Sequence, residues 1–401
     1  MPKVLRIINR FNLGGPTYNV AYLSRYLAPE FETLLVGGEK EESEDSSGHI
    51  LQQLGLNPVI IPEMKREINL KDDRIAYLKL KKLITEFKPD IVHTHASKAG
   101  TLGRLAADAC NIPIILHTFH GHVFHSYFGK TKTFVYKNIE RYLATKSTRI
   151  IAISELQKTE LTRIHHICSP EKVEVIPLGF DLQRFRDDRE NKRMDFRKTY
   201  GLEDQELAVM IMGRLVPVKN HRLFLEAIKY VKSNSKRRVR GVIVGDGELR
   251  GQIESWANEL GLTFSTPEQP LNASDLIFTS WIHRADWAFA GADIVALSSF
   301  NEGTPVSLIE AQAAGIPIVS TNTGGIENVV IPGVTASLAA KNNDADFCKK
   351  MLELTQNDAL RLQMSRAGWE HVRTTFHYTR LVDDMKNLYH RLLSGNTTGI
   401  R

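Results

Sequence analysis

Two carboxylates in this chain are spaced so that both could meet one ligand: Glu302 and Glu310, with seven residues between them. The short apolar run Ile294–Leu297 before them predicts a buried strand, and helix signals follow Glu302. Glu302 is therefore expected in a loop and Glu310 on the next helix, with its side chain directed back toward the helix start. A carboxylate in that place can accept hydrogen bonds from the hydroxyls of a sugar.

The helix that carries Glu310 is predicted to begin at the loop, because Thr304 is a good N-cap, Pro305 suits the first helical position and Gly315 marks an end. Its first N–H groups, those of Val306 and Ser307, would offer a positive dipole end to an anion. The combination suits a sugar nucleotide. Taken alone, Glu310 fits better as a surface residue of an amphipathic helix.

Two cations, Arg214 and Lys219, lie five residues apart after the apolar run Leu207–Met212. Cations near one loop can neutralise a diphosphate leaving group as its bond to a sugar breaks. Ordinary solvated charges are the alternative for this pair considered alone.

Composition limits the classes of protein that fit. The length of 401 residues and a hydrophobic fraction of 42% suit two packed domains. Three scattered cysteines, Cys110, Cys168 and Cys348, argue against a disulfide framework or structural zinc and favour a reducing cytoplasm. No run is long and apolar enough to span a bilayer, and no signal peptide is evident. The net charge of +6 fits an anionic ligand or membrane surface, and no nucleic-acid recognition motif is present.

Short β-branched runs alternate with helical patterns, which predicts parallel sheets covered by helices. The first series of expected strands comprises Val4–Ile8, Thr33–Val36, Val59–Ile61, Ile91–His93, Ile112–His117, Ile150–Ile153 and Val173–Ile176. The second series comprises Leu207–Met212, Gly241–Val244, Asp275–Phe278, Ile294–Leu297 and Ile316–Ser320. The fold class is therefore α/β with two doubly wound, Rossmann-like domains, and ligands are expected at the carboxyl ends of the strands.

The segment Pro177–Phe185 and the charged run Arg186–Lys198 separate the two series, and the hinge is placed there. The expected domains are residues 1–180 and 181–377. Residues 378–401 are expected to form an amphipathic helix, Tyr378–Leu393, and a frayed tail.

The spacing of Glu302 and Glu310 resembles the E-x7-E signature of retaining glycosyltransferases of family 4, which have the GT-B fold. Val175–Phe185 is similar to the interdomain linker of that family, and Gly213–Asn220 to its phosphate-binding loop. Further matches are Gly245–Leu249 and Asn322–Gly325. The resemblance implies a cleft between the two domains and a last helix that crosses back onto the first.

The resemblance also implies roles for individual residues. Glu302 would contact the donor sugar, Glu310 the ribose hydroxyls, and Arg214 and Lys219 the diphosphate. Further donor-binding positions are Gly15, Gly213, Ile282, Gly303, Thr304, Pro305, Val306 and Ser307. Pro16 and Thr17 would lie close to the acceptor. No bound metal is implied.

Histidines gather in the first domain at positions 93, 95, 117, 120, 122 and 125. Their spacing is that of strand ends and loops, with no carboxylate or cysteine to complete a metal site. Phe119–Gly121 resembles the His-Gly element of the family, which implies that His120 helps orient hydroxyls at the attacked carbon. On the acceptor side we expect His95 and Lys98, and Lys98 and Arg104 could meet an acceptor phosphate unless they are simply solvated.

The segment Phe278–Ile282 resembles the one that cradles the nucleotide base in the family. Ser280 stands where that segment usually has glycine, and Ile282 where it has a basic residue, so the base is not fixed. Trp281 fits the core as well as a stacking platform.

Aromatic and basic residues interleave between positions 124 and 141: Phe124, Tyr127, Phe128, Lys130, Lys132, Phe134, Tyr136, Lys137 and Arg141. Such a mixture favours peripheral contact with an anionic membrane, and a helix whose aromatics face the core is the alternative.

The resulting expectation is a retaining, metal-independent glycosyltransferase of the hexosyltransferase type, with a UDP-sugar as donor. A glycan or lipid-linked acceptor in surface polysaccharide biosynthesis is expected by analogy. The rival hypotheses are a sugar-nucleotide epimerase of the same fold and a non-catalytic sugar-nucleotide-binding subunit.

Overall fold

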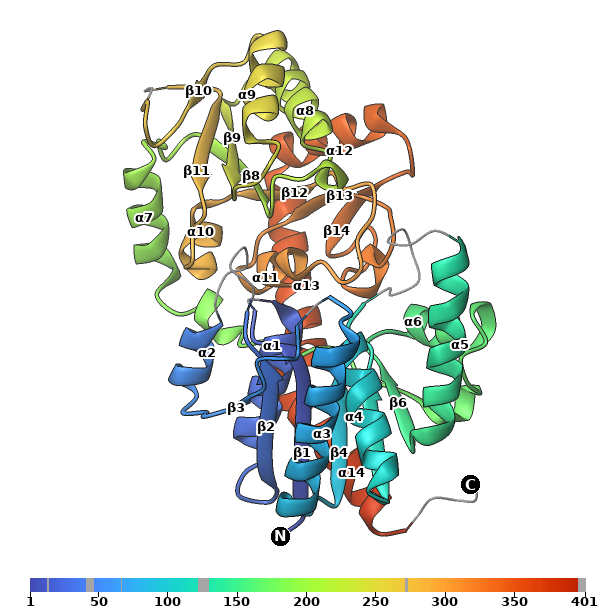
Figure 1. Ribbon diagram of the computed structural model, residues 1–401. Helices are drawn as coiled ribbons and strands as arrows, with labels where there is room; N and C mark the ends of the chain where they lie inside the picture. The colour runs from blue at the N-terminus through green and yellow to red at the C-terminus, as the bar shows by residue number, and fades with distance from the viewer. Residues whose placement is uncertain (13, 41–46, 66, 122–129, 271–272, 396–401) are drawn as a thin grey trace. The chain divides into compact units, whose positions relative to one another are not determined.

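The computed structural model describes residues 1–12, 14–40, 47–65, 67–121, 130–270 and 273–395 (Figure 1). The chain divides into two compact units. Unit 1 comprises Met1–Phe180 with Phe376–Arg401, and unit 2 comprises Asp181–Thr375. Each unit contains one parallel sheet with helices on both faces, so the predicted fold class is confirmed.

The sheet of unit 1 has the strand order β3-β2-β1-β4-β5-β6-β7. Its strands are β1 Lys3–Arg10, β2 Glu32–Gly38, β3 Val59–Ile60, β4 Ile91–His95, β5 Ile114–Thr118, β6 Arg149–Ala152 and β7 Val173–Val175. Its helices are α1 Gly15–Tyr26, α2 Gly48–Gln53, α3 Leu70–Phe87, α4 Ser97–Ala109, α5 Lys130–Lys146, α6 Glu155–Thr159 and α14 Tyr378–Leu393.

Alternating side chains of β1 divide the core of unit 1 between two faces. Val4 packs with α1 and α14, whereas Leu5 and Ile7 pack with α3 and α4. Both faces of the strand are covered, which is why its sequence is a nearly continuous apolar run.

Helix α14 has the predicted bounds and packs on unit 1, although it follows unit 2 in the chain. Its apolar stripe of Leu381, Met385, Leu388 and Leu392 repeats at helical spacing and is buried. The two chain segments that lead out of unit 1 and back are hydrogen bonded, since Phe180 N–H donates to the carbonyl of residue 376 at 2.8 Å.

The sheet of unit 2 has the strand order β10-β11-β9-β8-β12-β13-β14. Its strands are β8 Leu207–Met212, β9 Val239–Val244, β10 Phe264–Ser265, β11 Leu276–Ser280, β12 Ile294–Leu297, β13 Ile318–Thr321 and β14 Ala336–Ala339. Its helices are α7 Arg189–Thr199, α8 His221–Asn234, α9 Arg250–Glu259, α10 Ala285–Gly291, α11 Val306–Ala313, α12 Asp344–Gln356 and α13 Asp358–Thr375. Strands β10 and β14 were not predicted from the sequence.

The charged run Arg186–Lys198, where the hinge was placed together with Pro177–Phe185, is not an open linker. Most of it forms α7, which belongs to unit 2. Its charges bind partners about 100 residues away: Lys192 pairs with Asp286 at 2.8 Å, and Arg193 pairs with Asp293 at 2.7 Å. The sequence of the run shows only a series of charges, which is typical of a linker, because the partners of those charges lie far away along the chain.

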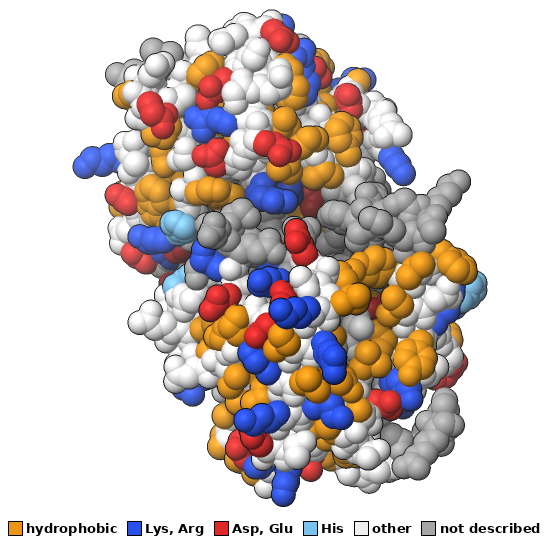
Figure 2. Space-filling model, viewed as in Figure 1, with side chains coloured by type: hydrophobic (Ala, Val, Ile, Leu, Met, Phe, Trp, Pro, Cys, Tyr) orange, Lys and Arg blue, Asp and Glu red, His pale blue; other side chains and the backbone are white. Residues whose placement is uncertain are grey.

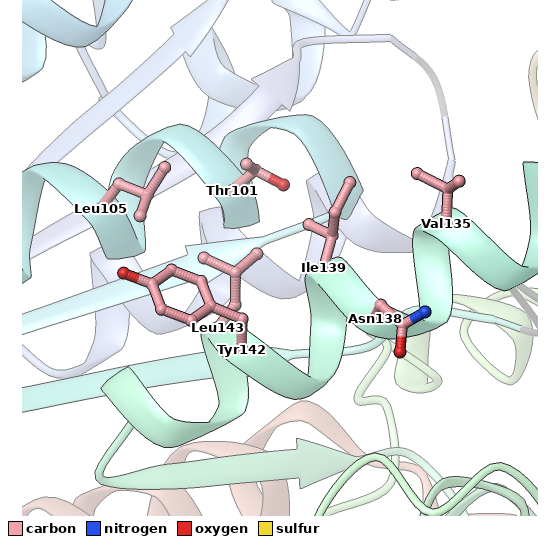
Figure 3. Close-up of a pocket in the computed structure, with 7 residues that line it drawn as sticks. All are labelled: Thr101, Leu105, Val135, Asn138, Ile139, Tyr142 and Leu143. Atoms are coloured by element: carbon pink, nitrogen blue, oxygen red, sulfur yellow. The ribbon is translucent and has the colours of Figure 1, made fainter.

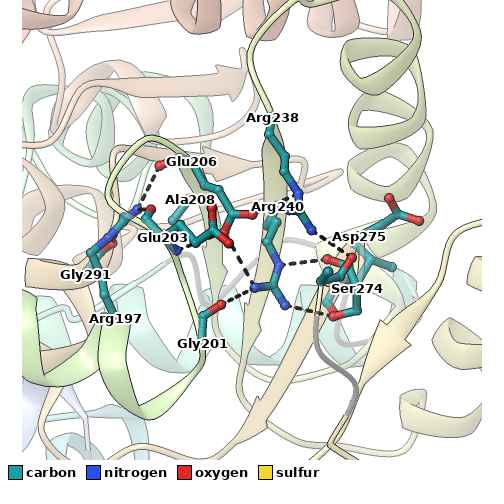
Figure 4. Close-up of polar contacts among 12 residues, drawn as sticks. Arg197, Gly201, Glu203, Glu206, Ala208, Arg238, Arg240, Ser274, Asp275 and Gly291 are labelled. Carbon is teal, nitrogen blue, oxygen red and sulfur yellow. Dashed lines mark hydrogen bonds and ion pairs between the residues drawn. The ribbon is translucent and has the colours of Figure 1, made fainter.

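A buried arginine on β9 joins three segments of unit 2 (Figure 4). Arg240 is 2% exposed, and its Nε donates to the carbonyl of Ser274 at 2.7 Å while its Nη1 donates to that of Gly201 at 2.6 Å. The carboxylate of Glu206, itself buried, lies 3.7 Å from Arg240 Nη1 and 2.8 Å from Arg238 Nε. Glu206 thus supplies the negative charge beside a buried cation.

We predict that Glu206→Ala destabilises unit 2 by about 3–5 kcal/mol, because buried Arg240 would lose the carboxylate that lies 3.7 Å from its guanidinium. The matched control is Glu259→Ala, which removes the exposed pair with Arg222 and should cost less than about 1 kcal/mol. Denaturation followed by tryptophan fluorescence reports on unit 2 alone, since it contains Trp256, Trp281, Trp287 and Trp369. Equal losses in the two variants would contradict the prediction.

Candidate active site

Main-chain hydrogen bonds join the loops at the carboxyl edge of the unit 2 sheet. The loop after β12 contacts the loop after β8, because Phe300 N–H donates to the carbonyl of Val218 at 2.8 Å. Ser298 Oγ donates to the carbonyl of Lys219 at 3.0 Å. On the other side, Gly325 N–H donates to the carbonyl of Glu302 at 2.8 Å. These bonds bring Lys219 and Glu302 to one place.

Two glycines permit this approach of main chain to main chain. A Cβ on Gly325 would lie 1.8 Å from the carbonyl oxygen of Gly303, and a Cβ on Gly245 would lie 2.0 Å from that of Gly213. No other residue fits at either position without movement of the neighbouring backbone. The motifs Gly245–Leu249 and Asn322–Gly325 are therefore explained by close packing.

Lys219 and Glu302 form an ion pair, with Lys219 Nζ 2.7 Å from Glu302 Oε1. Ser299 Oγ donates to the same oxygen at 2.6 Å. The side chains of Lys219 and Glu302 are 20% and 11% exposed, so both can be reached by a ligand. Both residues were predicted from the sequence, but their pairing and the part of Ser299 were not. Arg214 is exposed and has no side-chain partner within the described ranges.

The start of α11 differs from the prediction. The helix begins at Val306 with Pro305 in the cap position, where a ψ of 96° lies outside the helical range. Thr304 therefore does not cap the helix, and no side chain bonds to its first turn. The N–H groups of Val306 and Ser307 remain at the helix start, as expected. Gly315, with a φ of +67°, follows the helix, as predicted.

Glu310 lies in the second turn of α11 and pairs with Arg184, whose Nη2 is 3.5 Å from Glu310 Oε1. Burial raises the pKa of Glu310 to about 7, against the opposing effect of the Arg184 charge. The carboxyl is thus partly protonated at neutral pH. Arg184 was missed from the sequence, although it precedes Phe185 in the recognised linker segment.

Ser280, the last residue of β11, has a φ of +58°. That left-handed conformation favours glycine, the residue usually found there in the resembling family. Trp281 is 46% exposed and therefore is not a core residue. Ile282 beside it is half-buried.

In unit 1, the loop after β1 leads directly into α1. The helix begins at Gly15 with Pro16 in its first turn, and Thr17 Oγ1 donates to the carbonyl of Asn12 at 2.7 Å. The expected residues Gly15, Pro16 and Thr17 thus lie together at the carboxyl edge of the unit 1 sheet.

His95 and His120 share a hydrogen bond, with 2.9 Å between His95 Nδ1 and His120 Nε2. Burial lowers the pKa of His120 to about 3 and holds that of His95 well below its usual value. Both imidazoles are therefore neutral, and in their shared hydrogen bond one ring donates and the other accepts. The ring of His93 lies tilted against that of His95, with 4.2 Å between ring centroids, and its Nδ1 is 2.7 Å from the hydroxyl of Tyr389 on α14.

Lys98 and Arg104 differ in their access to ligands. Lys98 pairs with Asp73 at 2.5 Å at the start of α4. Arg104 is fully buried and pairs with Glu140 at 2.7 Å, so the suggestion that it meets an acceptor phosphate was wrong.

His122, His125, Phe124, Tyr127 and Phe128 lie outside the described residues. Across the described ranges, no group of three or more His, Cys, Asp or Glu side chains is arranged to hold a metal ion. No helix in the same part of the chain is long and apolar enough to cross a membrane.

Residues 192–371 match the family described as glycosyl transferases group 1, and residues 13–184 match glycosyltransferase family 4. The chain is 32% identical over 332 residues to the UDP-Gal:alpha-D-GlcNAc-diphosphoundecaprenol alpha-1,3-galactosyltransferase of Escherichia coli, and the match covers 82% of each chain. The chain belongs to glycosyltransferase family 4.

Other similar proteins agree with this assignment. The D-inositol 3-phosphate glycosyltransferase of Corynebacterium glutamicum (strain R) is 26% identical over 313 residues, 75% of this chain and 72% of that protein. The structure of Anabaena HepE in complex with UDP has a TM-score of 0.78 at 17% identity and covers 97% of this chain and 99% of that one. The family 4 transferase therefore has the GT-B fold, as the resemblance implied.

We predict that Gly325→Ala destabilises unit 2 of the transferase by about 1–3 kcal/mol, because the new Cβ meets the backbone at Gly303. Gly251→Ala is the matched control: this helical glycine faces open space, so the change should be neutral or stabilising by up to about 1 kcal/mol. Tryptophan fluorescence during denaturation measures both. Unchanged stability of the Gly325 variant would mean that the two loops do not lie as described.

We predict that UDP affinity of the transferase falls about tenfold per pH unit below pH 7 and levels off above it. The sign follows from the raised pKa of Glu310: a carboxylate that accepts hydrogen bonds from ribose must first lose its proton. The nucleotide phosphate titrates near pH ~6 as well. Calorimetric titration of wild type and Glu310→Gln separates the two contributions to the pH dependence of UDP affinity. The variant retains only the contribution from the nucleotide phosphate. Identical pH profiles would exclude Glu310 from the binding site.

Proposed function

We propose that this glycosyltransferase moves a sugar from a UDP-sugar to a lipid-linked diphosphate acceptor, with retention of anomeric configuration and without a bound metal. The name of the E. coli relative, which specifies UDP-Gal and GlcNAc-diphosphoundecaprenol, supports this choice of substrates. UDP-galactose is therefore the first donor to test.

The observation that carries the proposal is the Lys219–Glu302 pair beside the start of α11. On donor binding, the Lys219 ammonium would exchange its carboxylate partner for the diphosphate, and Glu302 would accept hydrogen bonds from sugar hydroxyls. Arg214, exposed on the same loop, adds a second cation. Two fixed cations can stabilise the charge that develops on the leaving diphosphate, which is why no metal is required.

The proposed step is attack on the face of the sugar that the UDP leaves. The acceptor hydroxyl oxygen forms a bond to the anomeric carbon while the bond from that carbon to the β-phosphate oxygen breaks. The hydroxyl proton passes to the departing phosphate oxygen, so UDP leaves as the protonated diphosphate. The protein positions the reactants and stabilises charge.

Unit 1 is proposed to supply the acceptor side. Neutral His120, held by His95 at 2.9 Å, can orient a hydroxyl without adding positive charge at the anomeric carbon. Lys98, Pro16 and Thr17 at the same sheet edge are proposed to contribute to the acceptor site.

Peripheral contact with an anionic membrane from the cytoplasmic side completes the proposal. Hydrophobic side chains gather where α4 and α5 lie on unit 1 (Figure 2), and α5 contains five basic residues. Three free cysteines support a reducing compartment.

The test is transfer from UDP-galactose to GlcNAc-diphospholipid in the presence of EDTA, with the product anomer assigned by NMR. We expect α-linked product from wild type, and a turnover lower by about 10²–10³-fold in Lys219→Ala. GDP- and ADP-sugars and the acceptor inositol 3-phosphate serve as controls for specificity.

The other outcomes discriminate among the alternatives. Dependence on added metal or a β-linked product would refute metal independence or retention. Epimerised donor without acceptor would indicate a non-transferring enzyme. Tight UDP binding with neither transfer nor hydrolysis across all acceptors would indicate a binding subunit.

A further inference from the structure

A groove of about 560 Å³ lies between α4 and α5 of unit 1 (Figure 3). Thr101 and Leu105 line it from α4, and Val135, Ile139, Tyr142 and Leu143 line it from α5. From Val135 to Tyr142 it extends roughly 10 Å at the rise of an α-helix. Ile139 is 40% exposed and Tyr142 is 55% exposed, so the apolar lining is open to solvent.

Two of the three polar side chains at this groove, those of Thr101 and Asn138, have their hydrogen bonds elsewhere, and the third is Tyr142. Thr101 Oγ1 donates to the carbonyl of Ser97 at 3.0 Å. Asn138, which also lines the groove, donates through Nδ2 to the carbonyl of Phe134 at 3.1 Å and accepts from Arg141 at 2.9 Å. These groups are therefore not available to recognise a sugar, and the groove suits a hydrocarbon chain.

The position of the groove links it to the proposed acceptor side. Helix α4 starts at Ser97, two residues after His95, which shares its hydrogen bond with His120. Thr101 lies one helical turn further on. A ligand with its polar end at the start of α4 could thus extend an apolar tail between the two helices.

Charge favours an anionic ligand. Helix α5 contains five basic residues, of which Lys146 pairs with Asp108 at 3.0 Å, and one acid, Glu140, which buried Arg104 neutralises at 2.7 Å. The excess of positive charge on α5 complements a phosphate or diphosphate.

We infer that the groove between α4 and α5 binds the apolar chain of the phosphate-linked lipid acceptor. This inference rests on the proposed function and adds the place where the chain is held. The groove then selects long-chain over short-chain acceptors through burial of methylene groups.

The test is calorimetric titration of the full-length protein with hexyl, octyl, decyl and dodecyl phosphate below their micelle concentrations. Wild-type affinity should rise about fourfold per added methylene until the groove is filled. Ile139→Asn, which places an amide in the lining, should abolish this increase. Val135→Asn tests the same lining if the first variant does not fold.

Leu78→Asn is the matched control, because Leu78 is an exposed apolar residue of unit 1 on α3, away from the groove. It should retain the dependence on chain length. Wild-type affinity that does not change with chain length would overturn the inference. Phe134→Asn alters α5 outside the lining. If this variant loses the dependence on chain length as fully as Ile139→Asn does, the inference is overturned, because the binding would then belong to the outer face of the helix.

Titration with UDP separates this inference from the proposed function. All variants should bind UDP like wild type. If alkyl phosphates bind but no lipid acceptor is glycosylated, the proposed substrate is refuted, and the inference that the groove binds an apolar chain stands. Transfer that is equally efficient with short-chain and long-chain acceptors would refute the groove and keep the proposed function.

Discussion

Contact of main chain with main chain at the carboxyl edge of the unit 2 sheet is the constraint on which the donor-side geometry depends. Parallel strands deliver all their carboxyl ends to one edge, but this alone does not join the loops that follow. The loops meet because Gly245 and Gly325 have no Cβ that would collide with the carbonyl oxygens of Gly213 and Gly303. The ion pair of Lys219 and Glu302 is a consequence, since it joins side chains from loops that the backbone has already fixed.

Burial then sets the protonation state of the groups near these edges. In unit 1 it keeps His95 and His120 neutral, so their hydrogen bond joins two uncharged rings. In unit 2 it acts on Glu310 in the opposite sense and stabilises the protonated acid, because desolvation always disfavours the charged form. Burial thus keeps the histidines of unit 1 uncharged and gives Glu310 of unit 2 a pKa close to neutral pH.

The sequence was most informative where local pattern determines structure. The alternation of apolar runs predicted the two sheets, and the stripe on α14 predicted both of its ends. It failed where the partner is distant. The charged segment that was interpreted as a linker forms α7, and Arg193 on that helix pairs with Asp293, which is distant in the sequence. Arg104 looked accessible because Glu140, which neutralises it, comes from another helix.

The candidate site shows the same division. Residue types and spacing suggested Glu302, Glu310 and Lys219, because family 4 motifs are local. The contacts of Glu302 with Ser299 and of Glu310 with Arg184 depend on loop conformation and were not foreseen. The cap of α11 was misplaced by one residue, since a proline φ suits both the cap and the first helical position and only ψ distinguishes them.

The place of α14 has a consequence for synthesis on the ribosome. The sheet of unit 1 is complete by Phe180, but the helix that covers one of its faces is made about 200 residues later. At ~5–20 residues per second this leaves that face with α1 but without α14 for on the order of ten seconds or more. During that interval the side chain of Arg6 also lacks the hydroxyl of Tyr389, to which it donates at 3.2 Å in the finished protein. Unit 1 can therefore reach its final form only after unit 2 has been translated.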